Sequence, residues 1–310
     1  MRETKEQEPG RARRGARWFR LAFVPALLSL SAACWIERDG LEPLLSASSL
    51  RIDYTSALLL LSILAICLAE RLYPANREWR YRLFSDGARG WARLGRDLVY
   101  LLFIAQVSAL LIKRTASWLH SAGLGGFPFA LWPARLPFGC KVVLAFLLVE
   151  FSSYWLHRAC HRFPLLWQFH STHHVVTELS GLKSLRTHPI DNVFFYLART
   201  APLLALGAGP DELVAVTYFG SVLGLLAHAN IEVSEGYWGL VINFPRYHSV
   251  HHSADPLESK SNFGCHTVLW DRLFGTFRSA PSGALRVGVE PLGARSLWQE
   301  LAWPFYRSLN

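Results

Sequence analysis

Six hydrophobic runs, almost free of charged residues, recur along the chain between polar segments. They cover residues 21–36, 55–69, 98–112, 141–156, 192–208 and 213–228. Each approaches the roughly 17–25 apolar residues that a membrane-spanning helix needs. A soluble helical protein could bury one such run in its core, but six of them favour an integral membrane protein built from α-helices.

The last two runs differ from the first four because only the short segment GAGPDE separates them. Gly207, Gly209 and Pro210 break a helix here, so we expect a tight reversal. The predicted fold class is an all-α integral membrane protein with four transmembrane helices and a membrane hairpin of two helices. The mixed sequence after the hairpin is expected to form a helical cap on the cytoplasmic surface.

Arginines lie beside the hydrophobic runs, chiefly within residues 11–20 and in the loop 71–96. Positive charges at the ends of membrane helices are typical of cytoplasmic loops. The net charge of +9 is explained in this way and does not indicate a nucleic-acid partner. We expect the amino terminus, this loop and the cap to face the cytoplasm. The first run also resembles a signal peptide, with small residues before Cys34, but an uncleaved helix fits the alternation of the later loops better.

Histidines cluster in the second half of the chain. The motif HRACH places two imidazoles four residues apart, and HSTHH and HSVHH repeat the spacings of three and four. Residues at these spacings share one face of a helix. Eight unpaired imidazoles beside a bilayer would be costly, because buried polar groups need partners. The clusters thus predict metal binding by His157, His161, His170, His173, His174, His248, His251 and His252.

Two single histidines, His188 in RTHPID and His228 in LLAHANI, are weaker candidates. They lie at the two ends of the predicted hairpin, which would return both to the surface that carries the clusters. This position strengthens both as candidate ligands but leaves the interpretation open at this point. His120 and His266 are interpreted as ordinary polar residues.

The number of histidines bears on the number of metal ions. Structural zinc is held by four protein ligands and catalytic zinc by three with a water, so eight to ten histidines indicate two ions. The sequence has no HExxH motif and no paired Glu-x-x-His of soluble di-iron bundles. Its five cysteines include no Cys-x-x-Cys pair, which leaves zinc ribbons and iron–sulfur clusters unsupported.

Polar side chains near the clusters could orient the ligating rings through their second nitrogen. Glu150 shares a helical stripe with the HRACH histidines, and a carboxylate near the end of a membrane span is otherwise costly. Further candidates are Asp255, Asn262 and Asp271. Asp271 could equally cap the turn RLFGTF.

The three histidine motifs in this order, with the hairpin between the second and the third, resemble the signature of the fatty acid hydroxylase and sterol desaturase superfamily. The similarity extends to YWLHR, LWQFHSTHH, LRTHPID, HANIE and SNFGCHTVLWDRLFGTF, and covers residues 140–280. Asp191 stands where the family usually has Glu, which leaves its orienting role open.

The resemblance implies a membrane-bound, O2-dependent, non-haem di-iron enzyme that hydroxylates or desaturates a C–H bond of a sterol-like or fatty-acyl lipid. It implies two iron ions, which zinc could replace, held by the eight clustered histidines with His188 and His228. The expected organisation is a basic cytoplasmic segment (1–20), a transmembrane region (21–135), the catalytic domain (136–280) and a cytoplasmic tail (281–310).

The chain has no haem-domain, flavin or ferredoxin signature, so a separate ferredoxin, cytochrome or reductase is expected to supply electrons. The basic 71–96 loop could attract this donor or could face anionic lipid headgroups. Two alternatives remain. A membrane haem electron carrier needs isolated histidines at matching depths, and only His228 comes close. A metal transporter needs polar residues along its spans, which the first four runs nearly lack.

Overall fold

The computed structural model describes residues 9–40, 42, 53–81, 87–122, 131–280, 285–289 and 296–306. Within this described part every regular element is a helix, and β-type pairing is confined to two isolated bridges. The prediction of an all-α fold is confirmed. The first helix begins at Pro9, so more than half of the basic segment expected at 1–20 is already helical.

The long helices are α1 (Pro9–Ile36), α3 (Tyr54–Leu72), the continuous α4 (Ala88–Val99), η1 (Tyr100–Ile104) and α5 (Ala105–Ser121), α6 (Phe138–Cys160), α8 (Pro189–Leu206) and α9 (Pro210–His228). The short helices are α7 (Pro164–His174), η2 (Gly181–Leu185), η3 (Gly236–Leu240), α10 (Pro245–His251), α11 (Leu269–Leu273) and α12 (Leu297–Tyr306).

Five helical segments of the described part are long and apolar enough to cross a membrane. They are Arg17–Ile36, Tyr54–Leu72, Ala88–Trp118, Phe138–Cys160 and Pro210–His228. The chain is thus a multi-pass membrane protein. Helix α8, expected as the first arm of the hairpin, is not among the five. Its residues Asp191, Asn192 and Arg199 make it more polar than the other runs.

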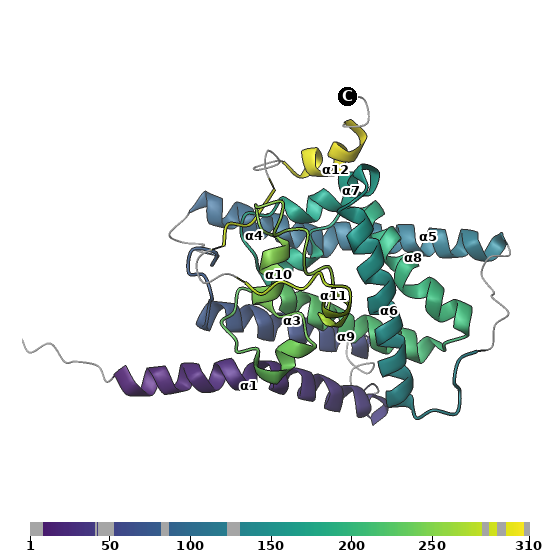
Figure 1. Ribbon diagram of the computed structural model, residues 1–310, viewed down its shortest axis with the longest axis horizontal. Coiled ribbons are helices and arrows are strands. Elements are labelled where there is room, and N and C mark those ends of the chain that lie inside the picture. Colours follow the sequence, from purple (N-terminus) through teal and green to yellow (C-terminus); the bar gives the residue numbers. More distant parts are fainter. Residues whose placement is uncertain are drawn as a thin grey trace, which may run out of the picture.

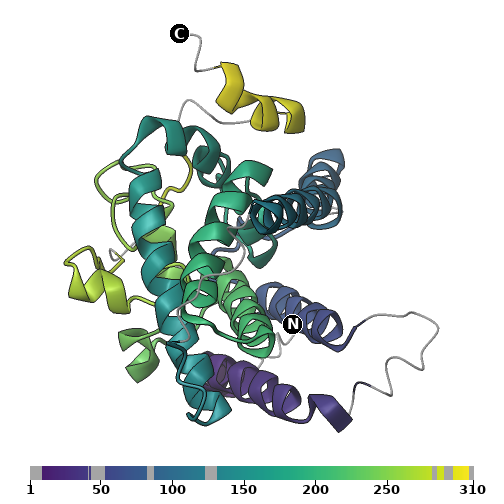
Figure 2. The same ribbon diagram turned by 90° about the vertical axis from the view of Figure 1, so that its right-hand side faces the viewer.

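The reversal predicted between the last two runs lies at Gly207, which ends α8 in the left-handed conformation with φ of +88°. Both arms pack against α6, and α9 also packs against α3 and α10. Figure 1 shows α1, α3 and the α4–α5 helix running in a common direction while α6 crosses them, and α6 stays upright in Figure 2. The carboxyl ends of α6, α7, α9 and α10 converge and carry the histidines.

Candidate metal centre

Nine of the ten predicted ligands gather into two groups where α6, α7, α9 and α10 meet. The five-histidine group contains His157, His161, His170, His174 and His251. The four-histidine group contains His173, His228, His248 and His252. Within each group, one ring nitrogen from every residue lies within 4.8 Å of the others, so each group could hold one metal ion.

The two His-x-x-His-His motifs divide their rings between the groups in opposite ways. On α7 the outer pair, His170 and His174, joins the five-histidine group, whereas His173 joins the four-histidine group. On α10 the outer pair joins the four-histidine group, and His251 joins the five-histidine group. A helix of 3.6 residues per turn places residue i+3 to one side of the line through i and i+4. Each motif therefore contributes to both groups.

Backbone carbonyls fix four of the rings, because Nδ1–H of each donates a hydrogen bond to a main-chain oxygen. The pairs are His157 with Phe263 (2.7 Å), His173 with Arg186 (3.3 Å), His228 with Gly224 (2.8 Å) and His251 with Ser261 (2.8 Å). A ring whose Nδ1 carries the proton presents the lone pair of Nε2. These contacts therefore leave Nε2 as the nitrogen that can bind a metal.

The Nε2 atoms of the five-histidine group are buried without hydrogen-bond partners. They belong to His157, His161, His170, His174 and His251. A buried polar atom without a partner costs about 1–3 kcal/mol, and five in one place are unfavourable unless something binds them. A metal ion would give all five a partner at once.

The Nε2 atoms of the four-histidine group face one another at close range. The separations are 3.0 Å between His173 and His228, 3.0 Å between His228 and His248, and 3.2 Å between His248 and His252. Ligands at about 2.0–2.1 Å from one ion lie about 2.9–3.4 Å apart. The spacing fits a shared metal better than a chain of hydrogen bonds, since a neutral imidazole has only one N–H.

Burial lowers the pKa of the histidines that lie outside the membrane spans, and neighbouring imidazoles add to the effect. The pKa is well below its usual value for His161, His173, His174, His248 and His252, and about 3 for His251. Neutral imidazole is the form that binds metal ions. At neutral pH these rings are thus ready to act as ligands.

Asp191 lies against one of these rings. Its Oδ2 accepts a hydrogen bond from Nδ1–H of His170 at 3.0 Å, and both side chains are buried. A carboxylate in this position holds the ring and makes Nε2 a stronger donor to a metal.

Comparison with known proteins gives the family. A sequence model described as fatty acid hydroxylase matches residues 142–276, the region that contains both histidine groups. Residues 142–276 therefore form a fatty acid hydroxylase domain, and the relatives of the chain belong to the fatty acid hydroxylase and sterol desaturase superfamily. No solved structure matches it.

Three relatives illustrate the superfamily. Ornithine lipid hydroxylase OlsE of Rhizobium tropici is 29% identical over 266 residues, which are 84% of this chain and 78% of the relative. Alkylglycerol monooxygenase of Danio rerio is 29% identical over 155 residues, 50% of this chain and 34% of the relative. Delta(7)-sterol-C5(6)-desaturase of Nicotiana tabacum is 28% identical over 136 residues, 43% of this chain and 47% of the relative. The chain, like them, is an oxidoreductase, and it spans less than half of the last two proteins.

Glu150 contacts His266 and not one of the nine grouped histidines, in contrast to the expectation from the sequence. Its carboxylate accepts hydrogen bonds from Nδ1–H of His266 (2.6 Å) and from the backbone N–H groups of His266 (3.0 Å) and Thr267 (2.8 Å). The His266 ring packs so closely on Gly220 that a Cβ there would lie 3.1 Å from it. His266, interpreted as an ordinary polar residue, is thus the partner of Glu150. Asp255 also lies away from the rings and caps its own loop.

Asn262 and Asp271 shape the backbone that supplies the carbonyls. Asp271 accepts the N–H groups of Phe263 and Gly264, both at 2.7 Å. Asn262 has a left-handed backbone with φ of +52°, which Asn tolerates better than most residues. The carbonyls on either side of Asn262 both reach histidine rings. Neither side chain contacts one of the grouped histidines, in contrast to the expectation. Both instead hydrogen-bond to the backbone around the two carbonyls.

His188 lies outside both groups. Its Nδ1 accepts the backbone N–H of Ile190 at 3.1 Å, which makes it the N-cap of α8, and its Nε2–H donates to the carbonyl of Leu301 at 3.1 Å. A neutral ring with both nitrogens engaged has no lone pair left for a metal. In contrast to the expectation from the sequence, the structure does not bring His188 to either group, because Pro189 starts α8 and makes the preceding residue its N-cap.

A buried ionic cluster that no motif marks supports α7. Glu300 of α12 pairs with Arg186 and with Arg96 (3.3 Å) and accepts a hydrogen bond from the hydroxyl of Tyr100 (2.8 Å). The carbonyl of Arg186 is the acceptor for His173. The segment expected as a tail therefore helps to hold the four-histidine group, through contacts that span more than 100 residues.

Proposed function

We propose that this chain is a membrane-bound, O2-dependent, non-haem di-iron enzyme that hydroxylates or desaturates a C–H bond of a lipid. The observation that carries the proposal is the pair of buried histidine groups, whose nitrogens converge without adequate hydrogen-bond partners. The groups are adjacent, since His174 of one stacks on His252 of the other with ring centroids 4.5 Å apart. Nitrogen ligands suit iron, and the same rings would accept zinc.

Bound iron would supply the redox chemistry that activates dioxygen toward an unactivated C–H bond. The chain's own residues hold and shield it. The main-chain carbonyls keep a proton on Nδ1 of four rings, so that Nε2 of each faces inward. Eight of the nine rings are buried and His161 is partly exposed, so water is largely excluded from the site.

A lipid substrate is supported by the five apolar helices, which put the site beside a bilayer. It is also supported by the names of the relatives, which include a lipid hydroxylase, an alkylglycerol monooxygenase and a sterol desaturase. Hydroxylation is the favoured reaction, because the relative that aligns over most of its length is a hydroxylase.

We assign the site to the cytoplasmic face, where a separate ferredoxin, cytochrome or reductase would deliver electrons. The assignment follows from the arginines of the 71–96 loop and the positive-inside rule. Two of these arginines have partners inside the protein, because Arg93 pairs with Glu178 (2.6 Å) and Arg96 with Glu300 (3.3 Å). Fewer charges are left to attract an acidic donor. Docking through the loop predicts that salt slows turnover with the native donor but not with a small chemical reductant.

The direct test combines metal analysis with turnover. Purified protein should contain two metal ions per chain, iron when it is active. Incubation with candidate lipids, a reductant and isotope-labelled dioxygen should give a product that carries the label if the reaction is hydroxylation, or an unlabelled alkene if it is desaturation. Full activity with a single ion would refute the dinuclear site.

A further inference from the structure

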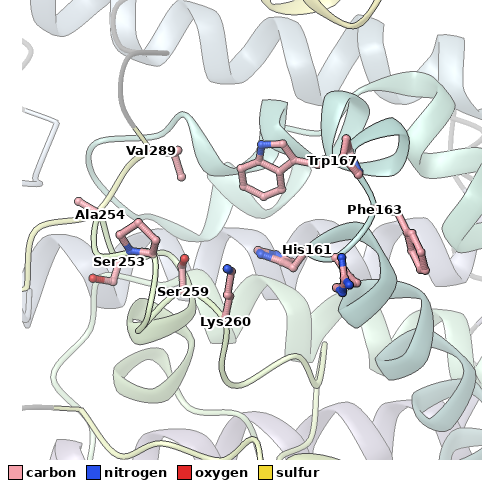
Figure 3. A pocket seen from close by; sticks show the side chains of 11 residues that line it. His161, Phe163, Trp167, Ser253, Ala254, Ser259, Lys260 and Val289 are labelled. Carbon is pink, nitrogen blue, oxygen red and sulfur yellow. The ribbon is translucent and has the colours of Figure 1, made fainter.

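A cavity of about 280 Å³ opens beside the five-histidine group. His161 forms part of its wall, and the ring of Trp167 lies over it with centroids 5.0 Å apart. Figure 3 shows these two side chains facing the loop that carries Ser259 and Lys260. His161 is the one member of the two groups that is not fully buried. The cavity therefore connects the outside of the protein with the candidate metal centre.

Two cations line this cavity, Arg162 and Lys260. In the described part of the chain, no carboxylate forms an ion pair with either of them. The Lys260 ammonium points toward His161 (Figure 3). The loop's carboxylate Glu258 accepts a hydrogen bond from Ser253 (2.6 Å) and does not line the cavity. The charge in the cavity is thus positive and unbalanced.

Helix α7 adds to this positive charge, because its first residue, Pro164, lies in the same wall. The amino-terminal end of a helix carries a partial positive charge and favours anions. The cavity therefore offers two side-chain cations and a helix terminus to one negatively charged group.

The surroundings of the cavity are apolar. Phe163, which lines it, is 55% exposed, and the neighbouring Leu165 and Leu257 are 66% and 73% exposed. Exposed apolar side chains beside cations are typical of protein surfaces that meet lipid headgroups. An acidic electron carrier would instead be steered by a wider charged surface. The combination favours a lipid over a protein as the occupant.

We propose that this cavity binds the anionic headgroup of the lipid substrate, a phosphate or carboxylate, through Arg162 and Lys260. The proposal rests on the proposed function, because it takes the five-histidine group as the place of oxidation. The volume corresponds to roughly nine water molecules of ~30 Å³ each, which suffices for a headgroup and a few carbons. The carbon that is oxidised is therefore close to the headgroup, and the rest of the lipid stays in the membrane.

The test uses the full chain in detergent, incubated with equal amounts of phosphatidylglycerol and phosphatidylcholine, and native mass spectrometry to count the lipids that stay bound. Wild type should retain phosphatidylglycerol in preference. The double variant R162E/K260E should lower this preference by about tenfold or more, because each charge reversal replaces an attraction by a repulsion. The variant Lys260→Arg should keep it. Arg135→Glu, an exposed arginine in the segment before α6, is the matched control and should also keep it.

Metal content is measured on the same samples, so that the two proposals can be separated. An unchanged lipid preference in R162E/K260E with metal intact would overturn the headgroup proposal. Wild-type protein that binds no metal would refute the proposed function, and the lipid measurement would still be readable. If the variant turns over more slowly with a ferredoxin but not with dithionite, and keeps the lipid preference, the surface docks the donor and the headgroup proposal is wrong. If charge reversal prevents purification, R162Q/K260Q replaces it with the same readouts.

Discussion

The two histidine groups differ in how they are closed. The four-histidine group is buried on every side, and its Nε2 atoms lie 3.0–3.2 Å from their neighbours. The five-histidine group has one more ring, and His161 opens it to the cavity. A closed group of four leaves little room for a substrate, whereas an open group of five can face one. Two sites built from the same side chain can thus differ in how accessible they are to a substrate.

Their supports differ as well. The loop around Asn262 orients two rings of the five-histidine group through its carbonyls, and Asp191 holds a third. In the four-histidine group, His173 and His228 donate to the carbonyls of Arg186 and Gly224, and His248 accepts a hydrogen bond from the side-chain amide of Asn243. Both groups have three supported rings, so the extra ring is the difference that should let the five-histidine group tolerate the loss of one ring better. Variants in each group can test this contrast.

Removing a ring from the four-histidine group should have the largest effect. His173→Ala leaves three ligands and breaks the contact with the carbonyl of Arg186. We expect the metal content to fall from two ions toward one and turnover to fall below detection. Membrane insertion should stay near normal, because the apolar helices drive it. Metal analysis and a lipid turnover assay on the purified variant measure both effects, and full activity would end the di-iron proposal.

Removing a ring from the five-histidine group should separate metal binding from turnover. His161→Ala leaves four rings around the ion, so we expect the metal content to stay close to two. Turnover should still fall by about 100-fold, since the ring borders the cavity and sets the open side of the site. The same two assays apply. Loss of one ion would mean that the two groups do not differ in redundancy.

The support of a single ring should matter less than the ring itself. Asp191→Asn keeps the shape of the side chain but removes the charge that holds His170. We expect turnover to fall by about 10-fold, at the lower end of what the loss of an orienting partner costs. Asp191→Glu restores the carboxylate and should recover most of the activity. Equal losses in both variants would point to packing in place of charge.

The sequence predicted which histidines come together better than how they are arranged. Spacings of three and four residues identified the rings of α7 and α10, because helical geometry alone places them on one face. Which ring joins which group depends on how the two helices face each other, and this is a tertiary property. Glu150 was expected to contact the histidines on its own face of α6. Its carboxylate instead contacts His266, which lies 116 residues away in the sequence. In contrast, the turn at Gly207 was predicted correctly, because it depends only on the residues at the turn itself.

His188 lies outside both groups, and a single histidine offers no spacing from which the sequence could have shown this. The smallest effect is therefore expected from His188→Ala. The change removes the N-cap of α8 and the bond to Leu301, so we expect the folded state to lose about 1–2 kcal/mol, measured as a lower unfolding temperature. Metal content should stay at two ions and turnover near wild type. His188→Asn can cap α8 without offering an imidazole, so it should recover part of the stability. If both variants lost an ion, His188 would be a ligand after all, and the contrast between a group of four and a group of five would no longer hold.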